Sequence, residues 1–540
     1  SSTNDFSRLI LIDTSKQNLG KNAQIILDNL NKDYLRIQSA ELEQSKIDWL
    51  TFIRDEKVII EDKKELRDHQ IKALNEIKKG FKNSDRGKLI MACGTGKTFL
   101  SLRIAEEITG IGGKVLYMVP SLSLMSQTVR EWKNDARSDF NAFSACSDNK
   151  VGRRNSTDDL IEIRLNDLSF PATTDAEKLA EQINKTKKEK MTVVFSTYQS
   201  IDVISKAQNE YDLSEFDLII CDEAHRTTGA TLVGDDESNF VRIHDNKNIK
   251  GAKRLYMTAT PKIFSDKAKK QADEGEASIA SMDDETIFGK VFYYLSFGEA
   301  VEKNLLSDYK VVVLHVDSRV VSDNLQRSWE AGSELNLDDA TKIIGCYKAL
   351  AKIGFYDDKK QGEIIDNKPI RRALAFCQNI NISEIFEKEF TGVIDEFQSN
   401  ENIKEEYKTN LDVKIKHVDG SFNAERRSER LSWLKDDVKK DECHVLTNVR
   451  CLSEGVDVPS LDAIMFLHPR KSQIDVVQAV GRVMRKAEGK NLGYVVLPVA
   501  VAPGVSAEKA LNDNERYRVV WQILNALRAH DERFDSTINQ

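Results

Sequence analysis

From about Lys63 onward, short apolar runs alternate along the chain with amphipathic stretches. Apolar runs separated by helical stretches are typical of parallel sheets covered by helices. Two consecutive α/β units of about 200 residues each are therefore expected, at 63–297 and 298–505. The predicted strands are 88–92, 114–120, 191–197, 216–223 and 253–260 in the first unit and 371–378, 413–420, 443–449, 462–469 and 493–498 in the second.

Two flanking segments lie outside this alternation. Residues 1–62 are expected to form a linker or a small accessory α/β segment, with a strand at 9–12 and a helix at 23–30. Residues 506–540 are expected to be a helical segment. Its helix, predicted at 508–529, would dock on another domain or lead to one.

The composition is that of a soluble globular protein, with 40% hydrophobic and 31% charged residues among 540. No run approaches the roughly 18 apolar residues that a membrane-spanning helix needs, so we expect no membrane partner and a cytoplasmic location. The net charge of −8 gives no indication of nucleic acid, although it is compatible with a local cationic groove. Residues 144–190 look like an insertion, and their charged run 185–190 is more typical of a solvated face than of a phosphate contact. The seven cysteines, at 93, 146, 221, 346, 377, 443 and 451, show no zinc-ligand spacing.

A phosphate-binding loop is predicted at 94–98, where Gly-Thr-Gly-Lys-Thr follows an apolar run and precedes a helical pattern. Glycines in such a turn let backbone N–H groups point at a polyphosphate, and the following helix adds its positive end. Lys97 is expected to reach the β- and γ-phosphates, and Thr98 to offer its hydroxyl to Mg2+. Met91 stands where the general pattern has glycine, a substitution common in helicase-like ATPases. The residues expected around the phosphates are Cys93, Gly94, Thr95, Gly96, Lys97 and Thr98.

An acidic pair follows the buried-strand pattern at 216–221. The strand delivers Asp222 and Glu223 at its carboxyl end, where ligands bind in open α/β sheets. Asp222 is expected to hold Mg2+ through water, and Glu223 to act as the general base on the attacking water. The alternative is an ordinary acidic loop or helix cap.

Three further groups appear in order along the chain. Arg67 and Gln70 lie upstream of the loop, where the Gln70 amide could read an adenine edge; a plain helix start is the alternative. Thr258 and Thr260 follow an apolar strand and, with His225, are expected to couple the nucleotide site to the other unit.

The third group lies in the second unit. Gln478, Arg482 and Arg485 are spaced by four and three residues, which places them on one face of a helix. Guanidinium groups suit the charge that develops on a transferring phosphoryl group. The alternative is a solvated basic helix.

This ordered set, with Glu-Gly-Val-Asp at 454–457, resembles superfamily-two helicases and translocases. The resemblance covers about 66–485 and implies two tandem RecA-like domains with ATP in the cleft between them. It also implies that Gly455 and Asp457 face the nucleotide from the second domain.

The same resemblance implies contacts to a nucleic-acid backbone along the opposite rim of both domains. Hydroxyl, amide and backbone N–H groups suit phosphate contact without sequence readout. The residues implied are Pro120, Ser121, Gln127, Thr197, Tyr198, Thr447 and Asn448.

A finer resemblance is to bacterial restriction enzymes of Type I-like systems, especially single-polypeptide (Type ISP) restriction-modification enzymes. It rests on the wording at 86–98, 195–200 and 221–229. It implies an Mrr-like nuclease before the motor, and a helical coupler, a methyltransferase and a target-recognition domain after it. No methyltransferase motif such as Asn-Pro-Pro-Tyr is found, so the chain is expected to be the motor of a longer polypeptide. Residues 1–62 would then lie between nuclease and motor.

The leading hypothesis is a DNA-stimulated ATPase that uses ATP and Mg2+ to translocate on double-stranded DNA. A strand-separating helicase acting on DNA or RNA is the first alternative. An ATP-gated clamp that grips DNA without moving is the second, although an intact Glu223 and both arginines argue against it. A nuclease is the least favoured, because no metal-binding carboxylate cluster is found.

Overall fold

The computed structural model of the chain describes two compact units that meet in sequence between Ser296 and Phe297. The residues described are 8–13, 22, 33–38, 42, 45–60, 62–146, 172–186, 188–232, 238–266, 269–270, 277–317, 337–353, 356–357, 363–364, 368–399, 409–422, 424–449, 452, 461–468, 472–501 and 518–533.

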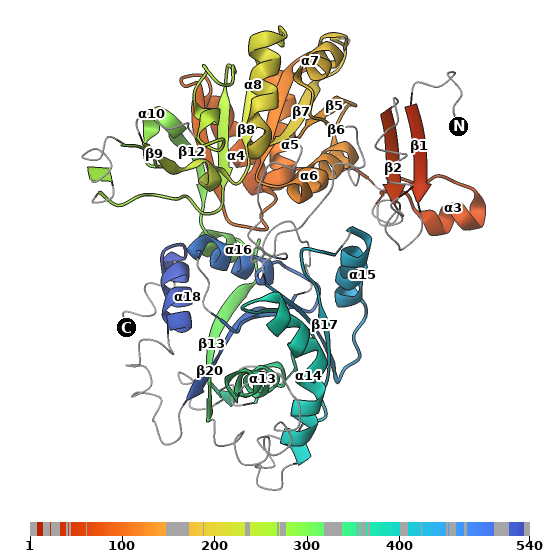
Figure 1. The fold of residues 1–540 in the computed structure, drawn as a ribbon, viewed down its shortest axis with the longest axis vertical. Coiled ribbons are helices and arrows are strands. Elements are labelled where there is room, and N and C mark those ends of the chain that lie inside the picture. The colour runs from red at the N-terminus through yellow and green to blue at the C-terminus, as the bar shows by residue number, and fades with distance from the viewer. Residues whose placement is uncertain are drawn as a thin grey trace. The chain divides into compact units, whose positions relative to one another are not determined.

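The first unit is built on a parallel eight-stranded sheet in the order β12-β3-β10-β8-β4-β7-β5-β6 (Figure 1). Its central strands are continuous apolar runs; Val115 to Val119 of β4, for example, are fully buried, as expected for a strand covered by helices on both faces. The strands are β3 (Arg86–Met91), β4 (Lys114–Val119), β5 (Asn141–Ala145), β6 (Ala172–Thr173), β7 (Thr192–Thr197), β8 (Leu218–Cys221), β10 (Arg254–Thr258) and β12 (Lys290–Leu295). The helices are α4 (Asp68–Gly80), α5 (Lys97–Thr109), α6 (Leu122–Asp135), α7 (Ala176–Asn184), α8 (Ile201–Glu210) and α10 (Glu285–Phe288).

The second unit has a parallel six-stranded sheet in the order β13-β20-β19-β16-β18-β17. The strands are β13 (Asp308–Asp317), β16 (Arg372–Phe376), β17 (Asp412–His417), β18 (Glu442–Asn448), β19 (Ala463–Phe466) and β20 (Leu492–Val501). The helices are α11 (Phe297–Glu302), α13 (Leu337–Leu350), α14 (Ile380–Ser399), α15 (Ala424–Lys435), α16 (Gln473–Val483) and α18 (Arg518–Arg528). Apolar residues of α13 and α14 pack with those of the sheet in one buried cluster.

Small elements complete the described chain. β1 (Arg8–Asp13) and β2 (Asp33–Gln38) form a parallel pair, and α3 (Trp49–Asp55) follows them. β9 (Gly229–Leu232) pairs antiparallel with β11 (Ala277–Ala280), and β14 (Tyr356–Asp357) with β15 (Glu363–Ile364).

The predicted α/β fold class is confirmed, and each predicted strand is present with slightly different ends. β12 and β13 were not predicted, although they add an edge strand to each sheet. The predicted insertion at 144–190 is corrected in part, because β5 and β6 extend the first sheet and α7 packs on them. The helix predicted at 23–30 lies outside the described residues.

The predicted C-terminal helix is seen as α18, which packs against α16 in the second unit (Figure 1). Its buried residues include Val520, Ile523 and Leu527. Within the described residues, no helix has the length and apolar character that crossing a membrane requires.

Candidate functional site

The loop predicted to bind phosphate joins β3 to α5. Gly94 and Gly96 have φ angles of 81° and 87°, a left-handed conformation that favours glycine. A Cβ atom at Gly96 would lie 2.5 Å from Nε2 of Gln70. Thr95 Oγ1 donates to the Ala92 carbonyl at 2.7 Å and ties the loop to the end of β3. The loop therefore leads directly into the positive end of α5, a helix of 13 residues.

The start of α4 supports this loop from one side. The Gln70 amide donates to the Gly96 carbonyl at 3.1 Å, and its Oε1 accepts the Arg67 backbone N–H at 2.9 Å. His69 Nε2 lies 3.0 Å from the Thr95 carbonyl. Gln70 and His69 are both buried, so this helix start helps to fix the loop. An adenine contact by Gln70 remains a prediction.

Asp222 follows β8 and is held by hydrogen bonds at each of its oxygens. Tyr117 of β4 donates its hydroxyl to Oδ2 at 3.1 Å, and the Glu223 backbone N–H donates to Oδ1 at 2.9 Å. Tyr198, after β7, donates to the Asp222 carbonyl at 2.8 Å. Burial raises the pKa of Tyr117 and of Tyr198 well above the ordinary value, so both hydroxyls stay protonated and can act as donors.

Glu223 adopts a left-handed backbone conformation, with φ 47° and ψ 48°. This conformation is uncommon for a residue other than glycine, and in proteins such strain is often found at functional sites. Glu223 Oε2 lies 3.4 Å from Nδ1 of His225. The turn thus carries a fixed Asp222 and, directly after it, a carboxylate beside a buried histidine.

β10 lies between β3 and β8, so its end stands between the loop and the acidic turn. His225 Nδ1 lies 3.1 Å from Thr258 Oγ1 and 3.4 Å from Thr260 Oγ1. The Thr260 backbone N–H donates to Thr258 Oγ1 at 3.0 Å. The structure therefore brings together the predicted coupling residues His225, Thr258 and Thr260.

The loop and the acidic turn suit a nucleotide and a divalent cation. Lys97 Nζ donates to the Met91 carbonyl at 3.1 Å, directly beside the loop. The Thr98 carbonyl accepts from Ser101 Oγ at 2.6 Å and from Trp132 Nε1 at 3.2 Å, which fixes the backbone that carries the Thr98 hydroxyl. Hydroxyl and carboxylate oxygens are the ligands that Mg2+ prefers.

In the second unit, α16 carries the predicted arginine group. Ser472 caps the helix by accepting the Asp475 N–H at 3.3 Å. Gln478 and Arg482 are 5% and 8% exposed, which contradicts the solvated basic helix. Arg485 follows the end of α16 by two residues. The predicted nucleotide contacts Gly455 and Asp457 lie outside the described residues.

The residues implied to contact nucleic acid differ in accessibility. Thr197, Tyr198, Thr447 and Asn448 are at most 5% exposed. Their side chains bond within the fold; Thr447 Oγ1, for example, donates to the Ser383 carbonyl at 3.1 Å. In this conformation these four side chains are not available to DNA. We therefore revise the expectation, so that any contact of these residues with DNA would come from their main-chain groups.

Two other implied contact residues are partly exposed: Ser121, which directly precedes α6, and Gln127, within it. Ser121 caps α6 by accepting the Leu124 N–H at 3.3 Å, and Gln127 Nε2 donates to Glu131 at 2.7 Å. The Pro120 carbonyl accepts from Gln199 Nε2 at 3.3 Å. The amino-terminal turn of α6 therefore keeps polar groups at the surface.

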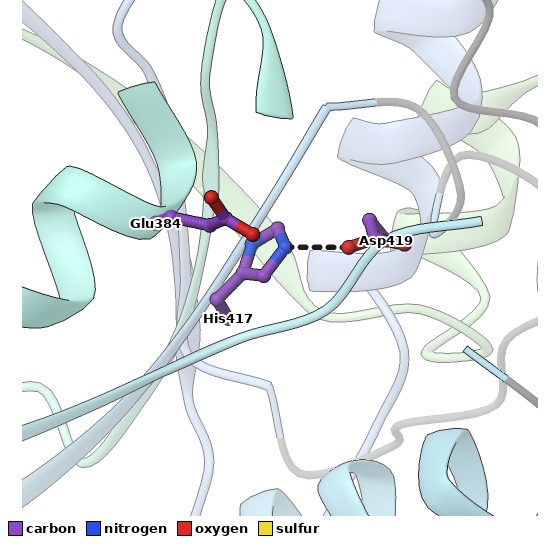
Figure 2. A group of neighbouring side chains, drawn as sticks. All are labelled: Glu384, His417 and Asp419. Atoms are coloured by element: carbon purple, nitrogen blue, oxygen red, sulfur yellow. Dashed lines mark hydrogen bonds and ion pairs between the residues drawn. The ribbon is translucent and has the colours of Figure 1, made fainter. Parts of the chain in front are cut away.

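A cluster of Glu384, His417 and Asp419 lies in the second unit (Figure 2). His417 Nε2 lies 2.9 Å from Asp419 Oδ2, and its Nδ1 lies 2.7 Å from Ser383 Oγ. Figure 2 shows the Glu384 carboxylate on the other side of the imidazole ring from Asp419. One ligand atom from each of Glu384, His417 and Asp419 lies within 4.8 Å of the others. Because both ring nitrogens have partners, Ser383, His417 and Asp419 form a hydrogen-bond chain that joins α14 to the end of β17.

Two family models match the two units separately. Residues 63–263 match the res subunit of Type III restriction enzymes, and residues 358–487 match the helicase conserved C-terminal domain. These two domains follow each other as in a RecA-like pair, with the loop and Asp-Glu-Ala-His turn in the first and the arginine helix in the second. The chain belongs to superfamily two of the helicases. Membership of this ATPase family implies ATP as the nucleotide.

This superfamily-two motor closely resembles solved Type ISP restriction-modification enzymes. It is 39% identical to the DNA-bound enzyme LlaBIII, with a TM-score of 0.83. The match covers 100% of this chain and 34% of the LlaBIII chain. It is 35% identical to a nuclease-deletion mutant of LlaGI in complex with a DNA substrate mimic, with a TM-score of 0.59, over 88% of this chain and 29% of that one.

More distant relatives share the motor region. A probable helicase of African swine fever virus is 26% identical over 488 residues, which are 90% of this chain and 46% of the viral protein. The endonuclease subunit of the Type I restriction enzyme EcoAI from Escherichia coli is 22% identical over 469 residues, 82% of this chain and 47% of that protein. The chain thus spans less than half the length of these relatives.

Residues 1–59 match a family of restriction endonucleases. The expectation that 1–62 only joins a missing nuclease to the motor is therefore corrected, because a nuclease-like segment is present within the chain. Within the described part of it, the parallel pair of β1 and β2 is the main element.

Two supporting residues of this motor were not predicted. Tyr117 and His69 act through contacts between elements far apart in sequence. Gln70 is predicted to contact adenine, and its amide also donates to the Gly96 carbonyl. The position of His69 beside Gln70 was a usable signal. Tyr117 lies in an apolar strand and gave none.

Proposed function

We propose that the chain is the ATP-driven motor of a bacterial restriction-modification enzyme of the Type ISP kind, and that it translocates on double-stranded DNA. The observation that carries the proposal is the likeness to LlaBIII over the whole chain, with a TM-score of 0.83 to a structure bound to DNA. The organised loop and acidic turn of the first unit support hydrolysis as its source of energy.

The chemistry assigns a role to each group of the first unit. The N–H groups of residues 94–98 and the Lys97 ammonium bind the phosphates. Thr98 and Asp222 hold Mg2+, which supplies positive charge to the phosphate oxygens when bound. Glu223 accepts a proton from the attacking water. The Tyr117 hydroxyl keeps the Asp222 carboxylate oriented, and the Tyr198 hydroxyl holds the Asp222 backbone through its carbonyl.

The second unit contributes one amide and two cationic side chains. Gln478, Arg482 and Arg485 approach the transferring phosphoryl group when the units close, and stabilise its charge. Hydrolysis then depends on closure, and loss of the bridging phosphate allows the units to open. With one DNA grip in each unit, repeated opening and closing moves the protein along the duplex.

DNA is the partner, and contact is expected through phosphates. Ser121, which caps α6, and Gln127, in its first half, are the partly exposed candidates in the first unit. Phosphate contacts give affinity without sequence preference and a strong dependence on salt. Recognition of a DNA site would come from other parts of a longer enzyme, which by this likeness are a coupler, a methyltransferase and a target-recognition domain.

A comparison of nucleic acids tests the proposal. We expect ATP hydrolysis to be stimulated by duplex DNA more than by single-stranded DNA or RNA. Displacement of a triplex-forming strand, without separation of the duplex beneath it, is the expected sign of translocation. The Glu223→Gln variant should bind the same duplex and displace no triplex strand.

Strand separation is the alternative outcome of this experiment. Several relatives of the chain are described as helicases, including the viral protein. ATP-dependent release of one strand from a plain duplex would replace translocation by a helicase function. Stimulation by RNA alone would overturn the restriction-motor origin.

A further inference from the structure

Lys490 lies between α16 and β20 in the second unit, on the segment that follows the arginine group. Its ammonium donates to three backbone carbonyls, those of Leu461, Val483 and Arg485; the distance to Arg485 O is 2.9 Å. An ammonium has three protons, so all of its donors are used by these carbonyls. One side chain thus connects the end of α16, the Arg485 turn and Leu461, two residues before β19.

The carbonyls at this helix end need such a donor. The last carbonyls of a helix have no partner within the helix, and a cation there also offsets the negative end of the helix dipole. The Met484 carbonyl, between the two that Lys490 takes, accepts the Ser307 backbone N–H at 2.7 Å. Gly493 packs close, since a Cβ there would lie 2.7 Å from the Val483 carbonyl. The backbone at 483–485 is therefore held at three consecutive carbonyls.

The charged groups around Lys490 are few. Burial lowers the pKa of Lys490 to about 8; Asp462, at the start of β19, opposes this shift, and Arg485 adds to it. Asp462 itself accepts the backbone N–H groups of Arg371 and Arg372, and burial raises its pKa. Lys490 is therefore protonated at neutral pH and loses its third donor proton at moderately alkaline pH.

We propose that Lys490 is a positioning residue for hydrolysis, which fixes the backbone turn that presents Arg482 and Arg485 to the nucleotide. The proposal rests on the ATPase function proposed above. It assigns Lys490 no contact with the nucleotide, because its three protons are all donated within the second unit. Its effect is on the geometry of the arginines, and a displacement of about 1 Å at such a group can lower turnover on the order of a hundredfold.

Lys486 provides a matched control. It lies four residues before Lys490 on the same segment, is exposed, and its ammonium contacts the Asn304 side chain. Lys486→Met removes the same charge and the same number of donors from the neighbourhood of Arg485. It leaves the three carbonyls at the end of α16 with their partners.

Two measurements on the full chain separate this proposal from the proposed function. Hydrogen exchange, read by mass spectrometry, reports the order of the backbone at 482–486 without any need for activity. Steady-state hydrolysis with duplex DNA reports kcat and KM for ATP. Thermal unfolding confirms that each variant is folded, and Lys490→Arg, which keeps the charge in a planar group, serves as the second variant.

We expect faster exchange at 482–486 in Lys490→Met, with kcat lowered about tenfold to a hundredfold, and KM and DNA affinity within about threefold of wild type. Lys490→Arg should fall between this variant and wild type, and Lys486→Met should match wild type. Wild-type kcat should also fall as the pH rises through about 8, and Lys490→Met should lack that step.

Exchange in Lys490→Met that equals wild type would overturn the proposal, as would a loss of kcat equal to that of Lys486→Met. If the wild-type chain hydrolyses no ATP, the proposed function fails by itself. The exchange comparison then still decides whether Lys490 holds the turn.

Discussion

The acidic turn of the first unit and the arginine turn of the second unit are held by different kinds of hydrogen bond. Asp222 is fixed through its side chain, by hydroxyl and N–H donors at both carboxylate oxygens. Around Arg485, Lys490 and Ser307 instead fix the backbone, because they donate to three carbonyls in a row, those of residues 483–485. A carboxylate that must present a metal benefits from a fixed orientation. An arginine predicted to contact a phosphate benefits from a fixed backbone at its base.

This difference leads to different expected defects. Changes around Asp222 should alter the requirement for the metal. Changes around the arginine turn should alter turnover and leave nucleotide and metal binding in place.

The largest expected effect is that of Arg482→Ala. Loss of a guanidinium that stabilises the transferring phosphoryl group should lower kcat on the order of a thousandfold or more. KM for ATP and the midpoint for Mg2+ should change little, because the predicted phosphate and Mg2+ ligands lie in the first unit. Arg482→Lys is the matched control; it keeps the charge but loses the planar fork, and should recover only part of the rate. Hydrolysis at half the wild-type rate by Arg482→Ala would remove the arginine from the site.

Glu223→Gln tests the first unit in the same assay. Without a carboxylate to accept the proton from water, kcat should fall roughly a hundredfold to a thousandfold, while ATP and duplex DNA still bind. Single-turnover measurements with bound ATP separate the chemical step from release of product. Near-normal turnover would show that another group acts as the base.

The chemical motifs were readable from sequence because each is local. A loop of five residues between an apolar run and a helical pattern, or an acidic pair at the end of a strand, keeps its meaning without knowledge of the fold. Tyr117 and Asp222 are different, since 105 positions separate them and they meet only because β4 pairs with β8. Which strand stands beside which cannot be read from alternation alone. The role of Lys490 was not predicted for the same reason, because its carbonyl partners belong to the ends of other elements.

The edge strands show a second limit. β12 is half exposed and lies directly before the junction expected at 297, and its mixed pattern lacks the continuous apolar run that marks the predicted strands. Tyr198 shows a third limit. A tyrosine in a motif implied to touch DNA proves to be fully buried and to donate to the Asp222 carbonyl. A motif gives residue types and spacing, whereas burial decides which side chains are accessible.

Tyr117→Phe should have the next largest effect. It measures how much the fixed orientation of the Asp222 carboxylate contributes to Mg2+ binding. This change removes the hydroxyl that donates to Asp222 Oδ2. It should raise the Mg2+ concentration for half-maximal hydrolysis roughly tenfold, with a smaller change in kcat at saturating metal. Tyr256→Phe is the matched control, because this buried hydroxyl lies 3.0 Å from His244 Nδ1 and does not touch Asp222. An equal rise in both variants would show a general loss of packing and no specific role for Tyr117.

The smallest expected effect concerns the cluster of Glu384, His417 and Asp419, which lies outside both turns. We interpret this cluster as stabilising the fold of the second unit, with no part in hydrolysis. His417→Ala leaves Ser383 and Asp419 without their buried partner, and the free energy of unfolding should fall by about 1–3 kcal/mol. Glu384→Gln changes an exposed carboxylate of the same cluster and should cost less than about 0.5 kcal/mol. Chemical denaturation of both variants measures the difference, with ATP hydrolysis near the wild-type rate in each. Zn2+ that raised the melting temperature of the wild type, and not that of His417→Ala, would show that these three residues bind a metal and would end the structural interpretation.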